Sequence, residues 1–238
     1  MATFEAQVEG LTGIAISTDT NPTQGELTQF LKDGVLDVTR RCIQAKPQDA
    51  TKFQRESAIT DTNSGLDVGG AQIISVIREA DTDGTTDGST SWRNCRQVAA
   101  HMQSRVVDPD SLHFASIYNP VYIIDDDGKV NVYPTPSANN GYKVFYVNNV
   151  PTESAPGSDP IDYESTAIAY FPIDKTYLVA IYAAIKTLEA KMANFAIDEE
   201  DTELVQAISS NLASLKQQYE GAFASMAPPQ PQQAGGRR

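Results

Sequence analysis

The sequence predicts an α+β protein with helices at both ends of the chain and a β-rich middle. Near the C-terminus, apolar residues recur at spacings of three and four over two consecutive stretches, which is typical of amphipathic helices. Between residues 48 and 150, apolar and β-branched residues instead form short clusters separated by turn residues, which indicates strands. Residues 226–238 are rich in Pro, Gln and Gly and lack the apolar residues that a packed core requires.

These changes of pattern divide the chain into four segments. Residues 1–47 form an N-terminal helical segment, and residues 48–150 form a central antiparallel β block with hairpins. Residues 151–225 are expected to form an antiparallel helical hairpin that packs with the N-terminal helix. Residues 226–238 are expected to form an extended C-terminal tail.

The N-terminal segment shows clear helix boundaries. A short helix is expected over residues 2–11, and a longer one begins after Thr23, where Glu26 stands three residues later and completes a capping box. The longer helix must end before Pro47, because proline disfavours a helical conformation in the residue that precedes it. Gly34 lies inside this helix, and its missing side chain would let a neighbouring element approach closely.

The β block contains one clear hairpin. Residues 121–124 and 129–133 flank an Asp-Asp-Asp-Gly turn, and both residue types tolerate the left-handed conformation that a tight turn requires. Residues 71–78 and 142–147 are further strong strand candidates. Weaker expectations are a strand over residues 53–60, a strand over residues 92–98, a helical turn over residues 99–105 and an exposed acidic loop over residues 81–91.

The C-terminal hairpin is the best-specified part of the chain. Its first helix follows Phe171-Pro172, and its second opens with the acids of residues 198–201, which suit the positive end of a helix dipole. The connector over residues 193–197 is short, so the two helices should run antiparallel. The apolar stripes consist of Leu178, Ile181, Ile185, Leu188 and Met192 in the first helix, and of Leu204, Ile208, Leu212, Leu215 and Tyr219 in the second.

Composition restricts the classes of function. The chain has 31 acidic and 18 basic residues, a net charge of −13, whereas proteins that wrap nucleic acid carry an excess of Lys and Arg. An acidic surface would repel DNA, which suits a conduit better than a binder. Two cysteines do not make a disulfide framework and are expected to be reduced. No signal peptide or membrane span is expected, so the protein should be made in a cytoplasm.

The search for catalytic or metal-binding motifs yields no candidate residues. Asp81, Asp83 and Asp87 resemble part of a calcium loop, but Thr86 stands where such a loop needs glycine and Trp92 where it needs glutamate. The two histidines and two cysteines lack the spacings of a zinc site. Nucleophile turns and phosphate-binding loops are not found either. We therefore predict no catalytic residue, no metal, no cofactor and no enzymatic activity.

The order of the predicted elements resembles that of the head-to-tail adaptor (connector) proteins of tailed bacteriophages and of related virion proteins of marine phages. The resemblance covers residues 25–225, and its most characteristic part is a Tyr-Pro-Thr-Pro run, a Val-Phe-Tyr strand and then an apolar helix. The runs concerned are residues 26–31, 35–43 with Arg40-Arg41, 118–122, 132–136, 144–146 and 177–184.

The resemblance implies a virion structural protein at the neck, made in the host cytoplasm. Such adaptors form a ring, typically of twelve copies, that joins the portal to the tail or nozzle and surrounds a channel through which double-stranded DNA passes without specific binding. The helical hairpin would then supply the contacts between subunits, and the tail would bind the portal. The residues concerned are Leu178, Ile181, Ile185, Leu188, Leu204, Ile208, Leu212 and Leu215 between subunits, and Pro228, Pro229, Pro231, Arg237 and Arg238 on the portal.

Two other hypotheses remain open. The subunit could be a tail terminator or another neck or tail component, and a copy number of six rather than twelve would then be expected. It could also be a carbohydrate-binding or hydrolytic module for host recognition, with its groove in the tyrosine-rich part of the β block over residues 118–146.

Overall fold

The computed structural model describes residues 2–62, 64–80, 91–137, 140–154, 159–195 and 202–226. The chain forms two compact units. Residues 1–53 and 150–238 belong to a helical unit, and residues 54–149 belong to a β unit. The helical unit is thus built from two distant parts of the chain, with the β unit inserted between them.

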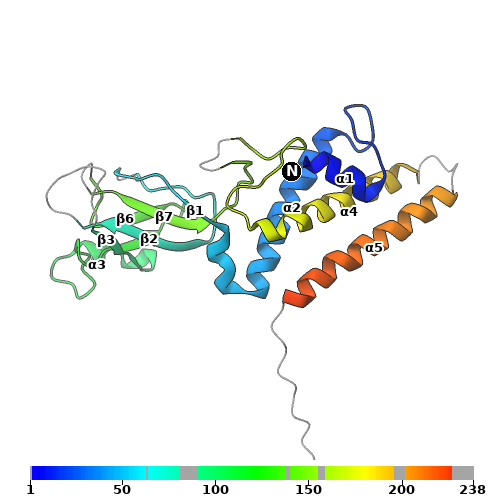
Figure 1. The fold of residues 1–238 in the computed structure, drawn as a ribbon. Coiled ribbons are helices and arrows are strands. Elements are labelled where there is room, and N and C mark those ends of the chain that lie inside the picture. The colour runs from blue at the N-terminus through cyan, green and yellow to red at the C-terminus, as the bar shows by residue number, and fades with distance from the viewer. Residues whose placement is uncertain are drawn as a thin grey trace, which may run out of the picture. The chain divides into compact units, whose positions relative to one another are not determined.

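The main helices of the helical unit are α1 (Phe4–Thr12), α2 (Gln24–Ala45), α4 (Thr176–Phe195) and α5 (Thr202–Met226) (Figure 1). Two short 3-10 helices, η1 (Pro47–Phe53) and η3 (Ile173–Lys175), follow α2 and precede α4. The capping box that the sequence predicts is confirmed, because the amide of Glu26 donates to Thr23 Oγ1 at 3.3 Å and the amide of Thr23 donates to Glu26 Oε2 at 2.8 Å. The predicted end of α2 before Pro47 is also confirmed.

Helix α4 is the centre of the helical unit. Helices α1, α2 and α5 all pack against it. A helix that is apolar around most of its circumference must be buried, and three of the buried residues of α4 are small alanines that let neighbouring helices approach. Its buried residues are Leu178, Val179, Ala180, Ile181, Ala183, Ala184, Ile185, Thr187 and Leu188.

Helices α4 and α5 form the antiparallel hairpin that the short connector predicts. The rings of Tyr182 and Tyr219 lie 6.0 Å apart, and Glu189, farther along α4, pairs with Lys216, earlier along α5, at 2.9 Å. The residue numbers of the contacts rise along one helix while they fall along the other. The acidic start predicted for the second helix, residues 198–201, lies outside the described residues.

Gly34 lets α2 approach α4 closely, as its place in the sequence suggests. A Cβ atom added to it would lie 3.0 Å from Tyr182 Cδ1 and 3.4 Å from Val179 Cγ1, both on α4. A larger side chain here would have to displace the tyrosine ring.

We therefore expect Gly34→Leu to lower the free energy of unfolding by about 1–3 kcal/mol, as overpacked sites do. Gly34→Ala should change it by less than about 1 kcal/mol, because the gain in helix propensity offsets a tight contact with a ring that can shift. Gly221→Leu in α5 is the matched control, because nothing lies within 4 Å of a Cβ atom there. Urea titration followed by circular dichroism measures all three, and a Gly34→Leu protein as stable as Gly221→Leu would contradict the close approach.

The β unit contains two sheets. The first has the strand order β1 (Gln54–Glu56), β7 (Tyr142–Val147), β2 (Ile73–Glu79) and β3 (Trp92–Asn94), with antiparallel pairing throughout. The second has the order β4 (Arg96–Gln97), β5 (Val121–Ile124) and β6 (Val130–Tyr133), with β4 parallel and β6 antiparallel to β5. The short helices η2 (Ala100–Met102) and α3 (Gln103–Val107) lie between β4 and β5 in the chain.

The predicted hairpin is formed by β5 and β6. Gly128 adopts a left-handed conformation with φ of +78°, and the amide of Lys129 donates to Asp125 Oδ1 at 2.7 Å, which closes the turn. The core of the β unit draws on both sheets. The hydroxyl of the fully buried Tyr142 in β7 crosses this core and donates to the carbonyl oxygen of Val130 at 3.0 Å. The core residues are Val68, Val76, Cys95, Tyr122, Val130, Val132, Tyr142 and Val144.

The structure departs from the predicted β block in three places. Residues 92–98 do not form the single strand that was predicted. They form two short strands, β3 and β4, which lie on either side of the buried Cys95 and belong to different sheets. The parallel pairing of β4 with β5 was not expected in an antiparallel block. The strand expected over residues 53–60 is only β1, because residues 47–53 form η1. The predicted acidic loop falls almost entirely on residues 81–90, outside the described part of the chain.

Candidate functional site

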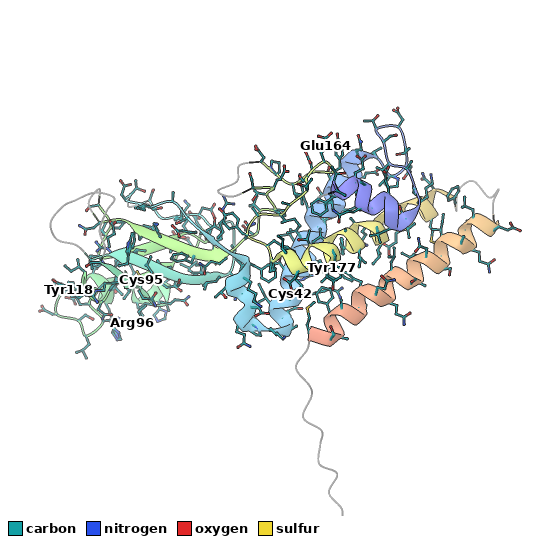
Figure 2. All side chains as sticks on the ribbon, in the orientation of Figure 1. Cys42, Cys95, Arg96, Tyr118, Glu164 and Tyr177 are labelled. Carbon is teal, nitrogen blue, oxygen red and sulfur yellow. The ribbon has the colours of Figure 1, made fainter. Side chains whose placement is uncertain are left out.

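Histidine, cysteine and carboxylate side chains are the usual metal ligands and nucleophiles, and the structure describes the surroundings of most of them. The described residues contain no group of three or more His, Cys, Asp or Glu side chains that could hold a metal ion. His101 is exposed and His113 is half-buried. Cys42 in the helical unit and Cys95 in the β unit are free and buried (Figure 2), and burial raises the pKa of the Cys95 thiol to about 12. These thiols are poor nucleophiles near neutral pH.

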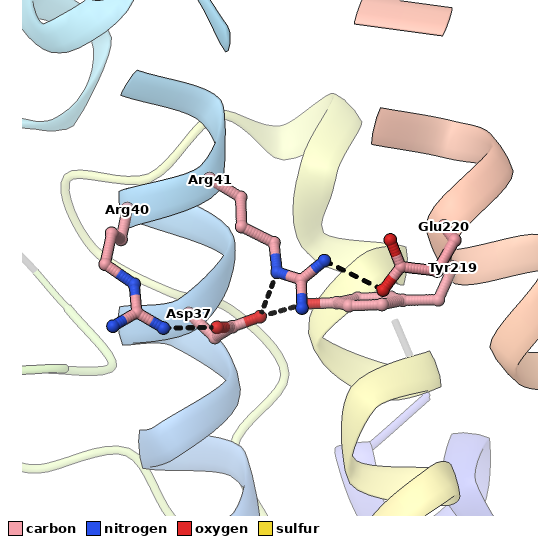
Figure 3. Close-up of polar contacts among 5 residues, drawn as sticks. All are labelled: Asp37, Arg40, Arg41, Tyr219 and Glu220. Atoms are coloured by element: carbon pink, nitrogen blue, oxygen red, sulfur yellow. Dashed lines mark hydrogen bonds and ion pairs between the residues drawn. The ribbon is translucent and has the colours of Figure 1, made fainter. Parts of the chain in front are cut away.

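A polar cluster instead joins the last turns of α5 to α2. The hydroxyl of Tyr219 donates to Asp37 Oδ2 at 2.8 Å, and Arg41 Nε lies 2.8 Å from the same oxygen (Figure 3). Arg41 Nη1 reaches Glu220 Oε1 at 2.9 Å, while Arg40 Nη2 binds the other oxygen of Asp37 at 2.8 Å. The spacing of four residues places Asp37 and Arg41 on one face of α2, and both contact α5 from there.

Two aromatic rings also pack against this cluster. The guanidinium carbon of Arg41 lies 5.2 Å from the ring centre of Tyr219 and 5.4 Å from that of Phe223. The two rings meet edge to face with their centres 5.0 Å apart, and both are buried. We call Asp37, Arg41, Tyr219, Glu220 and Phe223 the α2–α5 clamp.

The surroundings of Tyr219 and Arg41 keep both side chains protonated. Burial is the main cause that raises the pKa of the Tyr219 hydroxyl, and its hydrogen bond to Asp37 raises this pKa further. Burial opposes the charge of Arg41, but the hydrogen bond to Glu220 and the charge of Asp37 outweigh it, so that the pKa of Arg41 is raised. Tyr219 therefore keeps its proton and Arg41 its charge across the physiological pH range.

The clamp lies close to the end of α5. Phe223 lies less than one turn before Met226, the last residue of α5. The predicted tail was expected to begin at residue 226, whereas the helix continues through Met226. The residues predicted to bind the portal, which are Pro228, Pro229, Pro231, Arg237 and Arg238, lie outside the described residues.

A small cavity of about 130 Å³ opens beside Met226. Its rim carries two ion pairs, Lys52 with Asp49 at 3.0 Å and Lys175 with Asp174 at 3.1 Å, and Cys42 and Phe53 also line it. The volume lies below the roughly 300–1,000 Å³ of typical small-molecule sites. This cavity does not suggest a substrate pocket.

Six of the eight residues predicted to lie between subunits are buried within the single chain. They lie where α4 packs against α1, α2 and α5. A spacing of three and four residues predicts that a helix face is buried, but it does not predict whether the same chain or a neighbouring subunit covers that face. Leu204 is 42% exposed and Leu212 is half-buried, so these two retain surface for another molecule. The buried six are Leu178, Ile181, Ile185, Leu188, Ile208 and Leu215.

Sequence reasoning missed the α2–α5 clamp. Its members are far apart in the chain, since the hydrogen bond from Arg41 to Glu220 spans 179 residues. Local signals existed, because Asp37 and Arg41 stand four residues apart, as do Tyr219 and Phe223. Each pair lies on one face of its helix and indicates that this face contacts another element, but neither pair identifies that element.

Comparison with protein families shows which family the chain belongs to. The family model of the SU10 adaptor protein matches residues 7–238, which is nearly the whole sequence. The chain belongs to the SU10 adaptor protein family. This finding confirms the resemblance to bacteriophage adaptors that the order of elements indicates, and it favours a structural over a catalytic role. No curated protein matches the chain in sequence.

The α2–α5 clamp bears on how this SU10 adaptor family member could act. The α2–α5 clamp anchors the last turns of α5 to the body of the helical unit. The helices of the described part of the chain include none with both the length and the hydropathy of a membrane span.

Proposed function

We propose that the chain is a subunit of a twelve-membered ring of the phage neck that joins the portal of the head to the tail. Membership of an adaptor family supports this role. The observation on which the proposal mainly depends is the α2–α5 clamp, which holds the end of α5 immediately before the tail. A tail that departs from a fixed point loses less entropy when it docks than one that departs from a frayed helix.

The composition of the tail suits docking on a larger partner. Residues 227–238 contain three prolines and two arginines and no acidic residue. Prolines favour an extended conformation and so reduce the cost of ordering on the portal. Arg237 and Arg238 would pair with acidic groups of the partner.

The charge of the chain suits a subunit that surrounds passing DNA. The net charge is −13, and a channel wall of like charge would keep double-stranded DNA from adhering during packaging and ejection. The β unit would face the tail or nozzle components. In this assignment the protein is a part of the virion at the junction of head and tail.

Deletion of residues 227–238 tests the portal contact. We expect the shortened protein to keep its melting temperature, because the clamp and the core lie before the deletion, and to bind portal rings at least about 10-fold more weakly. Arg237→Glu with Arg238→Glu is the matched variant, which keeps the length and the prolines but reverses the charge. Co-sedimentation with purified portal rings measures the binding, and undiminished binding of the shortened protein would refute docking by the tail.

The copy number separates this function from its nearest alternative. Mass measurement of the assembly on the portal should give twelve copies, whereas six copies would favour a tail terminator.

A further inference from the structure

The β unit presents an exposed apolar loop over residues 107–118. Leu112 is fully exposed, and Val107 and Tyr118 are 53% and 68% exposed (Tyr118 is labelled in Figure 2). Phe114 is also partly exposed at 39%. Exposed apolar side chains that cluster in one short segment mark an interaction surface more often than single ones do.

The backbone of this loop is held in place by its own contacts. Val106 and Ala115 are buried against Val121 at its base, and the amide of Ala115 donates to the carbonyl oxygen of Val106 at 3.0 Å. Nearer the tip, the amide of Phe114 donates to the carbonyl oxygen of Ser111 at 3.0 Å. Leu112 is thus presented on an ordered turn, which lowers the entropy cost of inserting it into a partner.

The helical unit contains an open, mostly apolar groove of about 300 Å³. It lies between the end of α1, the second half of α4 and the first half of α5, and Lys191 stands at its edge. The ammonium group of Lys191 lies 5.2 Å from the ring centre of Phe195, and it forms no ion pair within the part of the chain that the structure describes. Leu204, Ala207 and Ile208 supply the α5 side of the groove.

We propose that Leu112 of one copy inserts into this groove of a second copy. The charges are complementary, because Asp108 and Asp110 stand beside Leu112 on the loop and Lys191 stands at the groove. The loop and the groove are different surfaces of the chain, so each copy can offer its loop to one neighbour and its groove to another, which is a heterologous contact. Contacts of this kind close into rings when the rotation between copies allows it. The inference rests on the proposed ring and names the contact that builds it.

Two single substitutions test the contact from either side. Leu112→Asp removes the apolar side chain from the loop, and Ala207→Glu fills the groove with a charge that repels Asp108 and Asp110. Both positions are exposed, so the fold should persist. We expect each to weaken self-association by about 10- to 100-fold, the worth of one buried leucine. Ser104→Asp and Ala213→Glu are matched controls, since they add the same charges at exposed positions outside the loop and the groove.

A mixture of the two variants identifies the occupant as a second copy. Leu112→Asp retains a working groove, and Ala207→Glu retains a working loop, so a mixture should form pairs that stop at two subunits while either variant alone stays monomeric. Analytical ultracentrifugation resolves these species. A mixture that remains monomeric, or a wild-type chain that remains monomeric at the highest soluble concentration, would overturn the contact.

The proposal and the adaptor role can fail separately. Rings that form on the portal with Leu112→Asp as readily as with the wild type would overturn the loop contact and leave the adaptor role intact. Loss of portal binding with unchanged self-association through the loop would have the opposite meaning.

Discussion

Replacement of Leu188 by alanine is expected to lower the free energy of unfolding of the single chain by about 2–5 kcal/mol. Leu188 has no exposed surface and lies at the centre of the helical unit, so the substitution removes buried methyl groups and leaves a cavity. Chemical unfolding at a protein concentration that keeps the chain monomeric measures the loss.

The same experiment decides what the apolar stripes of the hairpin do. Leu204→Ala is the matched control, because Leu204 is 42% exposed, and it should cost only about 0.5 kcal/mol in the monomer. If the stripe of α4 were instead completed by a neighbouring subunit, Leu188→Ala would leave the monomer unchanged and weaken only the assembly. That result would contradict the packing of α4 described above.

Tyr219→Ala is expected to have a similarly large effect, about 3–5 kcal/mol, because it removes a buried ring that packs on Tyr182, Phe223 and the guanidinium of Arg41. The last turns of α5 should then separate from α2. Hydrogen exchange of the amides in residues 216–226 measures this opening, and exchange as slow as in the wild type would contradict the role of the clamp.

Tyr219→Phe isolates the hydroxyl group. It keeps the ring but loses the hydrogen bond to Asp37, and we expect a cost of about 1–3 kcal/mol. The pH dependence should also change. Because the pKa of Tyr219 is raised in the folded protein, its contribution is complete below about pH 10, where an unfolded tyrosine ionises, and is lost as the pH rises further. The phenylalanine variant should therefore lose less stability than the wild type above about pH 10.

Local features of the chain were predictable from the sequence. The capping box of Thr23 and Glu26, the end of α2 before Pro47 and the hairpin closed by Gly128 all depend on residues within four positions of one another. The α+β class followed from periodicity alone, and the structure confirms it. The family relationship followed from the order of the elements, and the family match confirms it.

Features that depend on distant partners were not predictable. Residues 92–98 are divided between two sheets, because β3 pairs with one sheet and β4 with the other. The residues near Cys95 do not indicate which strands β3 and β4 will pair with. The clamp requires contact between α2 and α5, which are separated in the sequence by the whole β unit. The stripes of α4 and α5 showed correctly that apolar faces exist, but whether the chain itself or a neighbour covers them is a question of tertiary packing.

The discontinuous course of the helical unit has a consequence for biosynthesis. The β unit occupies one uninterrupted stretch, residues 54–149, and can fold while the rest of the chain is still being translated. Helices α1 and α2 precede the β unit in the chain, whereas α4, their packing partner, follows it and is therefore made later. Nascent chains should thus expose the apolar faces of these early helices for much of synthesis, and we expect chaperones to engage them there.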